Sequence, residues 1–345
     1  MPLFSVSNIL INSIAACVPS QTEDNQSFEL LNEAERNLFI KTIGIRYRKI
    51  VETGVTAADL CTKAANAILA NNNLNREEIK VLIFVSQTPD YLIPFTACTI
   101  QDKLGLSKNC MAFDINLGCS GYVYGLSIIS ALLQNMPGAK GLLLVGDCSS
   151  TCISMQDKSV APLFSDAGSA TLLEYKEGEQ MHFNLQTDGK EFDDIIISDG
   201  GMKHPFVSDS LLYKEIAIGQ VRNNLHMKLD GMKIFNFALR EVPGNVAQLL
   251  EYSATPKEQI DKAYFHQANL LMNERVRIKI GIPEDKVPYS LYDYGNTSSA
   301  SIPLTLCAYP THSQTVLLSG FGVGLSWGSA LVNLDATNIL PMLTY

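Results

Sequence analysis

The stretch that decides the fold is Asn116-Leu117-Gly118-Cys119-Ser120-Gly121-Tyr122, a turn of small residues that leads directly into the helical pattern 123–133. It places a thiol at the start of a helix, where unpaired backbone N–H groups and the helix dipole favour the thiolate. We therefore expect the pKa of Cys119 to lie below the roughly 8.5 of a free thiol. Gly118 and Gly121 allow a tight turn and a close approach of substrate, as in other strand-to-helix nucleophile elbows. Taken alone, the segment fits a catalytic nucleophile and a buried structural cysteine about equally well.

Short, continuous apolar runs surround this turn, and their length is typical of strands that are covered on both faces. They lie at 81–85, 142–146 and 170–173 in the first half and at 263–265, 316–320 and 329–332 in the second. Helical patterns at 57–70, 96–104 and 269–280 separate them. The glycine near the end of a strand-like run is also repeated, since Val145-Gly146-Asp147 in the first half corresponds to Ser319-Gly320-Phe321 in the second. The similar order of the two halves indicates an internal duplication.

We predict an α/β fold made of two such halves, with mixed sheets packed in α/β/α/β/α layers and equivalent loops meeting at a shared cleft. The first half, 1–178, carries the nucleophile, and the second is 179–345. A single doubly wound domain with insertions is the alternative. The segment 175–228 is polar and rich in turn residues, so we interpret it as a linking excursion with little chemistry of its own.

The composition excludes several classes of function. The chain has 345 residues and a net charge of −9, with no Lys/Arg run and no basic amphipathic stretch that would indicate binding to nucleic acid or to a membrane. Its apolar runs are strand-sized, far below the ~20 residues of a membrane span. Because no signal segment is recognisable, we expect a cytoplasmic protein with reduced thiols. The eight cysteines include no C-x-x-C pair, and Cys148 and Cys152 lack neighbouring histidines, so no metal site is predicted.

Three further segments could supply partners for the thiol. His266 follows a strand-like run and should stand at a strand end, whereas the other four histidines lie in polar or turn-like surroundings. Asn296 precedes Thr and Ser residues in a second turn into a helix, where an asparagine can simply satisfy the turn. The Gly-rich loop 319–328 could present backbone N–H groups to an oxyanion or merely turn the chain, and it lacks the lysine of a P-loop.

Together these segments resemble the thiolase-fold condensing enzymes, and most closely β-ketoacyl-acyl carrier protein synthase III. The similarity extends from about residue 40 to residue 332 in the family's order. It is carried by Gly44-Ile45-Arg46, the AFDIN-LGCSGY segment around Cys119, Phe164-Ser165-Asp166-Ala167-Gly168, the His-Gln-Ala-Asn box, the Gly-Asn-Thr-Ser box and the terminal GLSWGSALV.

The resemblance implies a Cys-His-Asn triad formed by Cys119, His266 and Asn296. Cys119 would take an acyl primer as a thioester, with the backbone N–H groups of Cys119 and Val323 as the oxyanion hole. His266 and Asn296 would donate hydrogen bonds to the thioester oxygen of a malonyl-type extender as it loses carbon dioxide, and the product would be a 3-oxoacyl thioester. The family works without metal or cofactor, forms homodimers and uses acyl carrier protein or acyl-coenzyme A substrates, so the same is expected here.

The resemblance also suggests residues that contact the substrate and the carrier. The substrate contacts are Phe235, Ile93, Asn269, Gly322 and Gly324, and the carrier or coenzyme contacts are Arg46, Lys158 and Arg275. Ile93 belongs to the loop 89–94, which in the family crosses the dimer axis and closes the partner's acyl pocket. A phenylalanine is common at this position, so the smaller Ile93 would leave room for a longer or branched primer.

Several positions depart from the family's pattern. Leu38 and Lys158 stand where members that use coenzyme A have a tryptophan and an arginine around the adenine. Leu271 replaces an arginine that contacts the carrier's phosphates, and Asn236 replaces a lysine. We therefore expect an acyl carrier protein, rather than coenzyme A, to deliver the primer.

Three other functions compete with condensation. An acyltransferase of the same fold could pass the acyl group to a hydroxyl or an amine, but it would have less need of Asn296. A noncatalytic partner subunit, like the chain-length factor of some ketosynthase pairs, would not need Cys119. A papain-like hydrolase also uses Cys, His and Asn, but its nucleophile normally lies near the mature N-terminus of a secreted chain.

Overall fold

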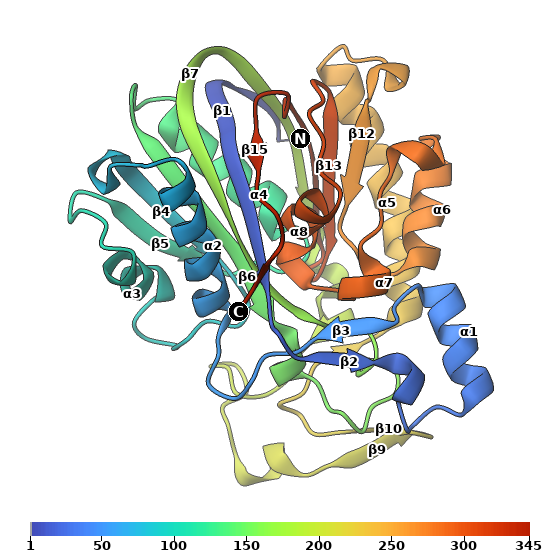
Figure 1. The fold of residues 1–345 in the computed structure, drawn as a ribbon. Coiled ribbons are helices and arrows are strands. Elements are labelled where there is room, and N and C mark those ends of the chain that lie inside the picture. The colour runs from blue at the N-terminus through green and yellow to red at the C-terminus, as the bar shows by residue number, and fades with distance from the viewer. Residues whose placement is uncertain (1) are drawn as a thin grey trace.

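The computed structural model describes residues 2–345 and joins the long strands into one ten-stranded mixed sheet (Figure 1). Its order is β12-β13-β14-β7-β6-β4-β5, with β1 beside β7 and the short β15 and β16 beside β1. The strands of this sheet are β1 (Leu3–Val18), β4 (Ile79–Val85), β5 (Met111–Ile115), β6 (Lys140–Cys148), β7 (Asp166–Thr187), β12 (Lys262–Phe265), β13 (Val316–Gly322), β14 (Ser326–Val332), β15 (Asn338–Ile339) and β16 (Leu343–Thr344). Smaller pairs are formed by β2 (Thr22–Asp24) with β3 (Tyr47–Lys49), β8 (Ile195–Ile196) with β11 (Lys228–Leu229), and β9 (Lys214–Ala217) with β10 (Gln220–Arg222).

Eight α-helices accompany the strands in the described residues. They are α1 (Glu33–Ile43), α2 (Ala57–Asn71), α3 (Thr96–Lys103), α4 (Gly121–Leu133), α5 (Gly231–Tyr252), α6 (Leu270–Ile280), α7 (Leu291–Tyr294) and α8 (Ser301–Ala308). The helices and strands predicted around the Cys119 turn are all present, and their ends differ from the prediction by a few residues. The largest difference is at β7, which is much longer than the predicted strand 170–173.

The two halves of the molecule share β1 and β7. The first part of β7 pairs with β6, from Asp166 opposite Cys148 to Glu174 opposite Lys140. Its second part pairs with β14, and β1 runs antiparallel to both parts. The predicted boundary at 178 falls within β7, between its two paired parts.

Three hydrophobic cores confirm the predicted layers. The central core combines α4 and α8 with the inner faces of both parts of the sheet. A second core lies between α2, α3 and the outer face of the first part, and a third lies between α5, α6 and the outer face of the second part. The position of α4 follows from its sequence, because this helix carries apolar residues all around and must be covered on every side.

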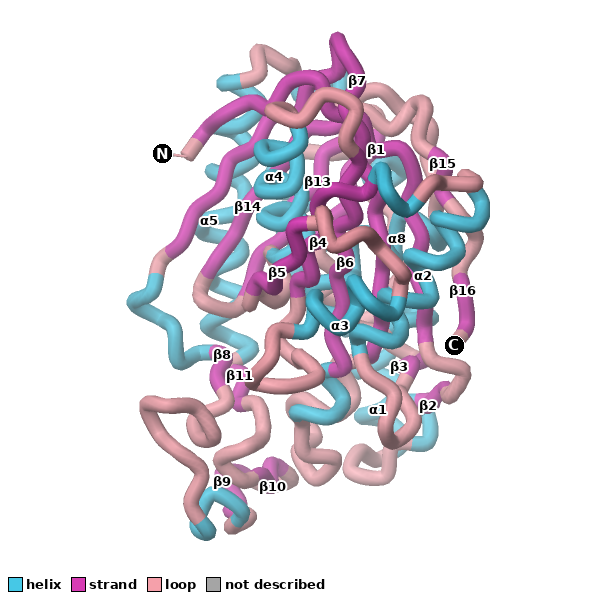
Figure 2. Tube along the Cα trace, turned by 90° about the vertical axis from the view of Figure 1, so that its left-hand side faces the viewer, coloured by secondary structure: helices cyan, strands magenta, loops and turns pink. Residues whose placement is uncertain are grey.

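Strand β5 forms one edge of the sheet, beside α3 (Figure 2). It is partly exposed, and the loop between β4 and α3 exposes Leu92 and Ile93 almost completely, at 91% and 89%. An edge strand with unpaired backbone groups and apolar neighbours is a surface on which a second chain can pair. No helix within residues 2–345 is both long enough and apolar enough to cross a bilayer.

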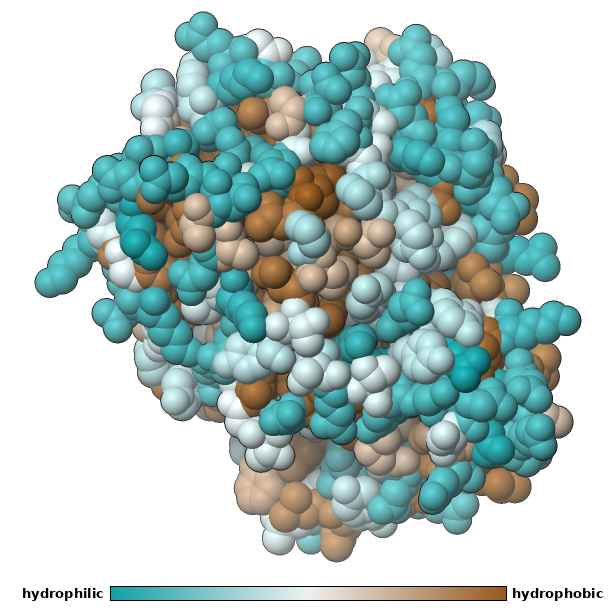
Figure 3. Space-filling view, viewed as in Figure 1, coloured by the Kyte–Doolittle hydropathy of each residue, from teal (hydrophilic) through white to brown (hydrophobic). Residues whose placement is uncertain are grey.

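The interpretation of 175–228 as a polar linking excursion is wrong for two of its parts. Residues 175–187 continue β7, and Met181 and Phe183 are buried in the central core while the polar residues that alternate with them face the other way. That alternation of period two is the strand signal that the high polarity of the segment obscured. Around β9 the segment is not uniformly polar, because it exposes apolar side chains such as Ile216 and Ile218. Figure 3 shows apolar surface at the lower end of the molecule, where Figure 1 places β9.

Candidate active site

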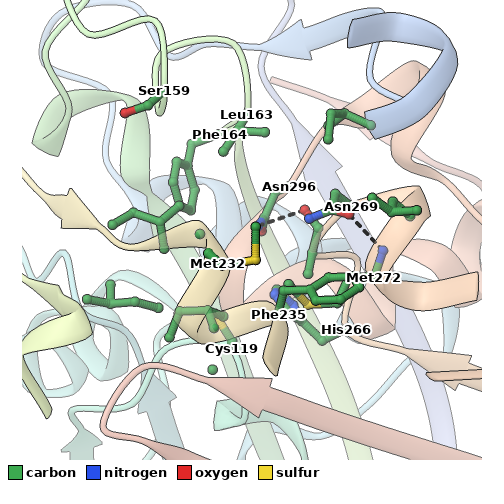
Figure 4. A pocket seen from close by; sticks show the side chains of 18 of the residues that line it. Cys119, Ser159, Leu163, Phe164, Met232, Phe235, His266, Asn269, Met272 and Asn296 are labelled. Carbon is green, nitrogen blue, oxygen red and sulfur yellow. Dashed lines mark hydrogen bonds between the residues drawn. The ribbon is translucent and has the colours of Figure 1, made fainter. Parts of the chain in front are cut away.

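Cys119, His266 and Asn296 line one pocket of about 480 Å³, although they lie far apart in the chain (Figure 4). Each of them follows a strand or precedes a helix of the central layers. Cys119 lies between β5 and α4, His266 follows β12, and Asn296 precedes the short 3-10 helix Ser298–Ala300 that leads into α8. The structure therefore brings the predicted triad together at the junction of the two halves.

Close backbone packing fixes the position of Cys119. The side chain is buried, with 9% of its surface exposed. A Cβ atom added at Gly322 would lie 2.8 Å from its Sγ, and one added at Gly320 would lie 2.9 Å from its carbonyl oxygen. Glycine is required at both positions because the terminal loop approaches Cys119 so closely. The Gly-rich loop therefore has a role in packing, in addition to any role in binding an oxyanion.

We predict that Gly322→Ala impairs the nucleophile. The added methyl group would overlap Sγ of Cys119, so either the thiol or the β13–β14 turn must shift. A displacement of about 1 Å in a reacting group can cost about 10²-fold in rate, and we expect a loss of that size in acylation, measured by single-turnover mass spectrometry. Gly138→Ala is the control for adding a methyl group, because nothing lies within 4 Å of that position. Because Gly138 has a positive φ of 80°, both variants must first be compared for stability.

The expected low pKa of Cys119 is wrong. Burial raises the pKa of this thiol to about 11, and the buried Asp147 carboxyl adds to the rise. The N–H groups of Val323 and of Cys119 itself, together with the Ser298 hydroxyl, act in the opposite direction by hydrogen bonding to the sulfur. Desolvation thus outweighs the helix N-terminus. The two N–H groups that point to the sulfur are the pair predicted as the oxyanion hole.

Asp147 was missed as a site residue, although its Val-Gly-Asp segment marked the duplication. The carboxylate is buried at the end of β6, where burial raises its pKa. It accepts hydrogen bonds from the Ser86 hydroxyl at 3.2 Å, the Gln87 N–H at 2.7 Å, and the Ser299 N–H and hydroxyl at 3.2 and 2.5 Å. It thereby ties the end of β4 to the turn that carries Ser298, whose hydroxyl contacts the thiol.

The imidazole of His266 is neutral at physiological pH. Its pKa is lowered to about 4 by complete burial. Nδ1 lies 2.8 Å from the Ser301 hydroxyl, which also accepts the Gln267 N–H at 3.3 Å. This pattern favours a hydroxyl proton directed at Nδ1, because the same oxygen already accepts from the backbone, and it leaves the proton of the ring on Nε2. The Ser298 backbone, which partly offsets the lowering of the His266 pKa, competes for that proton, so His266 donates into the pocket where a substrate oxygen takes its place.

Asn296 also has a donor available. Its Oδ1 accepts the Ser298 N–H at 2.9 Å, which fixes the orientation of the carboxamide. Its Nδ2 makes one long hydrogen bond, of 3.4 Å, to the Ala268 carbonyl, and a second hydrogen on that atom has no partner among the described residues. Asn296 can therefore satisfy the turn through Oδ1 and still donate a hydrogen bond to a substrate through Nδ2.

We predict that the two halves of the reaction differ in their dependence on pH. Acylation should accelerate from pH 7 to 9, because the thiolate is the nucleophile and the pKa of Cys119 is about 11. Decarboxylation should stay level from about pH 5.5 to 8, since His266 protonates only near pH 4. Single-turnover acylation and release of carbon dioxide, measured separately across pH, test both statements. An acid limb near pH 6.5 in decarboxylation would contradict the neutral donor.

The same lowered pKa affects stability. A histidine that is neutral when folded and has an ordinary pKa when unfolded takes up protons on unfolding, so its contribution lowers stability as the pH falls from about 6.5 toward 4. Measurements of decarboxylation must therefore be paired with a check of folding below pH 5.5.

The other predicted contacts divide into two groups. Phe235, Asn269, Gly322 and Lys158 line the pocket, although Asn269 already caps α6 by accepting the Met272 N–H at 2.8 Å. Val323 lines a neighbouring cavity instead. The residues that do not line the pocket are Ile93, Gly324, Arg46 and Arg275. Arg46 lies in an ion pair with Asp24 at 3.2 Å, and Arg275 is exposed on α6.

The pocket is lined mainly by apolar side chains, except at its floor, where Cys119, His266 and Asn296 lie. Residues that sequence reasoning missed include Phe39, Leu163, Phe164, Met232, Met272 and Phe321. Their apolar positions are typical of core residues, and only the tertiary arrangement shows that they face a cavity. Met232 and Leu271 are partly exposed where α5 and α6 meet the entrance. Among residues 2–345, no group of three or more His, Cys, Asp or Glu side chains is arranged to hold a metal ion.

Comparison with known proteins gives one consistent family. The model of the 3-oxoacyl-[acyl-carrier-protein (ACP)] synthase III family matches residues 113–189, and the model of its C-terminal part matches residues 250–334. A 3-oxoacyl-[acyl-carrier-protein] synthase 3 of Campylobacter jejuni is 37% identical over 85% of this chain and 83% of its own length. A beta-ketoacyl-[acyl-carrier-protein] synthase III of Streptococcus agalactiae is 35% identical over 94% of this chain and 98% of its own. The crystal structure of a 3-oxoacyl-(acyl-carrier protein) synthase from Burkholderia xenovorans superposes with a TM-score of 0.92 at 36% identity, over 99% of both chains.

Proposed function

Because this chain belongs to the family of 3-oxoacyl-[acyl-carrier-protein] synthase III, we propose a role in the family's reaction for each polar group at the floor of the pocket. The enzyme is an acyltransferase that condenses an acyl primer with the malonyl group of malonyl-acyl carrier protein, releasing carbon dioxide and forming a 3-oxoacyl thioester. The observation that supports the assignment of roles is the presence of Cys119, His266 and Asn296 in one pocket with a neutral imidazole.

In the first half-reaction, the thiolate of Cys119 attacks the carbonyl carbon of the primer thioester. The N–H groups of Cys119 and Val323 stabilise the oxyanion of the tetrahedral intermediate; their proposed role is supported by the way both lower the pKa of the neighbouring thiol. The carrier's thiol then leaves, and the acyl group stays on Cys119. Burial of the thiol raises its pKa, so acylation depends on the small thiolate fraction and on these two donors.

In the second half-reaction, Nε2–H of His266 and Nδ2–H of Asn296 donate hydrogen bonds to the thioester oxygen of the malonyl group. Negative charge develops on that oxygen as the bond to the carboxylate breaks and carbon dioxide leaves. The resulting enolate carbon attacks the acyl group on Cys119, and the thiolate is expelled. Transfer to a hydroxyl or an amine is not favoured, because the two donors are suited to an enolate.

Intact-protein mass spectrometry tests this function. Wild-type protein is incubated with acyl thioesters of several chain lengths, on coenzyme A and on acyl carrier protein, and then with malonyl-acyl carrier protein. We expect an acyl adduct that malonyl-carrier discharges into a 3-oxoacyl product. An adduct that is discharged by hydroxylamine but never by malonyl-carrier would refute condensation.

An acyl carrier protein is the proposed primer donor. Leu38, which is 63% exposed, and Lys158, the single cation among the residues that line the pocket, stand at the positions where members that use coenzyme A hold an adenine between an aromatic ring and an arginine. Arg275 and Lys158 are the proposed contacts of the carrier's acidic surface, with Arg46 restrained by its ion pair. The test compares the rate of acylation of Cys119 by one acyl group carried either on acyl carrier protein or on coenzyme A. Equal rates would refute a preference for the carrier protein.

A homodimer in the cytoplasm is proposed for the working enzyme. The free edge of β5 and the exposed Leu92 and Ile93 support pairing with a second copy, and all eight cysteines are free, as in a reducing compartment. In such a dimer, Ile93 would approach the partner's active site. Light scattering of wild type and Ile93→Asp tests this, with a dimer expected only for wild type. The control is Ile218→Asp, which removes a similarly exposed isoleucine far from β5 in sequence.

A further inference from the structure

Asp147 lies at the end of β6, beside the active-site pocket and not in its lining. The side chain is buried, with 1% of its surface exposed. Together with Ser298 and Val323 it lines the neighbouring cavity, of about 340 Å³. Any effect of this carboxylate on the condensation therefore acts through other residues.

The two oxygens of the carboxylate bind different halves of the molecule. Oδ1 accepts the Gln87 N–H at 2.7 Å and the Ser86 hydroxyl at 3.2 Å, both just after β4 in the first half. Oδ2 accepts the Ser299 N–H at 3.2 Å and the Ser299 hydroxyl at 2.5 Å, in the turn before α8 in the second half. Each oxygen thus binds one backbone N–H group, which can donate but never accept. The carboxylate joins the two halves beside the active site.

Both of the segments that Asp147 joins pack against the turn that carries Cys119. Oε1 of Gln87 fills the space beside Gly118, because a Cβ atom added at this glycine would overlap it. At the start of α4, a Cβ atom added at Gly121 would lie 3.5 Å from Cβ of Ser299. The position of the nucleophile is therefore referred to the same two segments that the carboxylate connects.

The second-half contact of Asp147 leads to Asn296 through Ser298. Ser298 has a positive φ of 49°, which is uncommon for a residue other than glycine. Such a conformation persists where the surrounding contacts hold it. The Ser298 N–H donates to Oδ1 of Asn296 at 2.9 Å, and the next residue, Ser299, is held by its two hydrogen bonds to Asp147. The carboxylate therefore supports the backbone that orients the Asn296 carboxamide.

We propose that Asp147 is a positioning residue that places Asn296, and with it the enolate, within reach of the acyl group on Cys119. The enolate carbon must attack the acyl carbonyl carbon before it takes a proton from water, a side reaction that leaves hydroxide and acetyl-acyl carrier protein. A displacement of about 1 Å between reacting groups can slow their reaction by about 10²-fold, and protonation then wins. Asp147 thereby couples the loss of carbon dioxide to condensation. This inference rests on the proposed function.

Asp147→Asn tests the proposal without changing the size of the side chain. A carboxamide accepts through one atom and donates through the other, so it cannot serve the backbone N–H groups of both Gln87 and Ser299. We expect the acylated variant to release several-fold more carbon dioxide than it forms 3-oxoacyl product, with acetyl-acyl carrier protein as the balance, whereas wild type should form the two in equal amounts. An unfolded fraction lowers both amounts equally, so a ratio that stays at one would overturn the proposal.

The rate of acylation provides a second readout. Burial and, to a smaller extent, the charge of Asp147 raise the pKa of the Cys119 thiol. Loss of the charge favours the thiolate, so Asp147→Asn should form the acyl adduct at pH 7 at least as fast as wild type. Slower acylation with an unchanged product ratio would mean that Asp147 only maintains the fold.

Two further variants locate the effect. Ser299→Ala removes the hydroxyl that contacts Asp147 and keeps the backbone N–H, so it should raise the ratio by less and add little to Asp147→Asn in the double variant. This milder change also carries the test if Asp147→Asn does not fold. Asp114→Asn is the matched control, because this carboxylate on β5 accepts the N–H groups of Thr96 and Ala97 at 2.6 and 2.7 Å, outside both cavities. A raised ratio in the control would contradict a specific role for Asp147.

Wild-type protein separates this inference from the proposed function. If its acyl adduct is never discharged by malonyl-carrier, the condensation itself is wrong. If wild type condenses and the ratio of carbon dioxide to product stays at one in Asp147→Asn, the function stands and the coupling role of Asp147 is wrong.

Discussion

Replacing Cys119 by alanine is expected to abolish condensation, with a loss on the order of 10⁴-fold or more. The side chain lines the pocket beside the backbone N–H groups that lower the pKa of its thiol, and the other seven cysteines do not line the pocket. Without Sγ no acyl-enzyme can form, so the adduct seen by intact-protein mass spectrometry should disappear as well. The removed thiol is small, and the fold should tolerate its loss.

The variant should nevertheless keep part of the chemistry. His266 and Asn296 do not need the thiol in order to bind the malonyl thioester, so Cys119→Ala should still release carbon dioxide from malonyl-acyl carrier protein. Cys98→Ala is the matched control, because that half-buried cysteine lies on α3 outside both cavities. Full condensation by Cys119→Ala would mean that another group carries the primer.

Replacing His266 or Asn296 by alanine should have the opposite pattern. Each change removes one donor to the developing enolate, which is typically worth about 10²–10³-fold in rate, so release of carbon dioxide should fall by that factor. Acylation of Cys119 should be much less affected, because its oxyanion contacts the backbone N–H groups of Cys119 and Val323. Pre-steady-state acylation and release of labelled carbon dioxide measure the two effects separately.

The geometry also predicts how conservative changes behave. Asn296→Asp keeps the shape but places a carboxylate where negative charge develops, so it should be worse than alanine in decarboxylation. Ser301→Ala serves as a probe of positioning, since Ser301 contacts His266 only through Nδ1. It should slow decarboxylation by less than His266→Ala and leave acylation in place. A loss of acylation in His266→Ala comparable to that of decarboxylation would show that His266 also acts on the thiol.

Much of the fold was predictable because its signals are local. The apolar runs that became β4, β6 and β13 are continuous since both faces of these strands are covered. The sequence predicts only the first part of the long β7. The middle of this strand is exposed and contains Gly178, and its second part alternates buried and polar side chains. The mixed pattern there resembles a loop in composition and a strand only in periodicity.

The roles of the triad needed more than local signals. Asn296 alone fits a satisfied turn, and its Oδ1 does satisfy the turn through the Ser298 N–H. Asp147 gave no chemical signal at all, because a carboxylate that accepts hydrogen bonds from two distant segments is recognisable only when those segments meet. The protonation of Cys119 and His266 was likewise beyond local reasoning, since burial shifts both pKa values and burial is a property of the packed molecule.

By itself, the sequence determined the elements, the repeated order of the two halves and the candidate triad Cys119, His266 and Asn296, because periodicity, turn residues and motif order are written along the chain. Only the tertiary structure decided which side chains line the pocket with Cys119 and how Asp147 anchors the Ser298 turn. The physical reason is that desolvation and cavity shape depend on which distant segments exclude water from one another. Local propensity cannot specify that exclusion, and the chemistry of Cys119 depends on it.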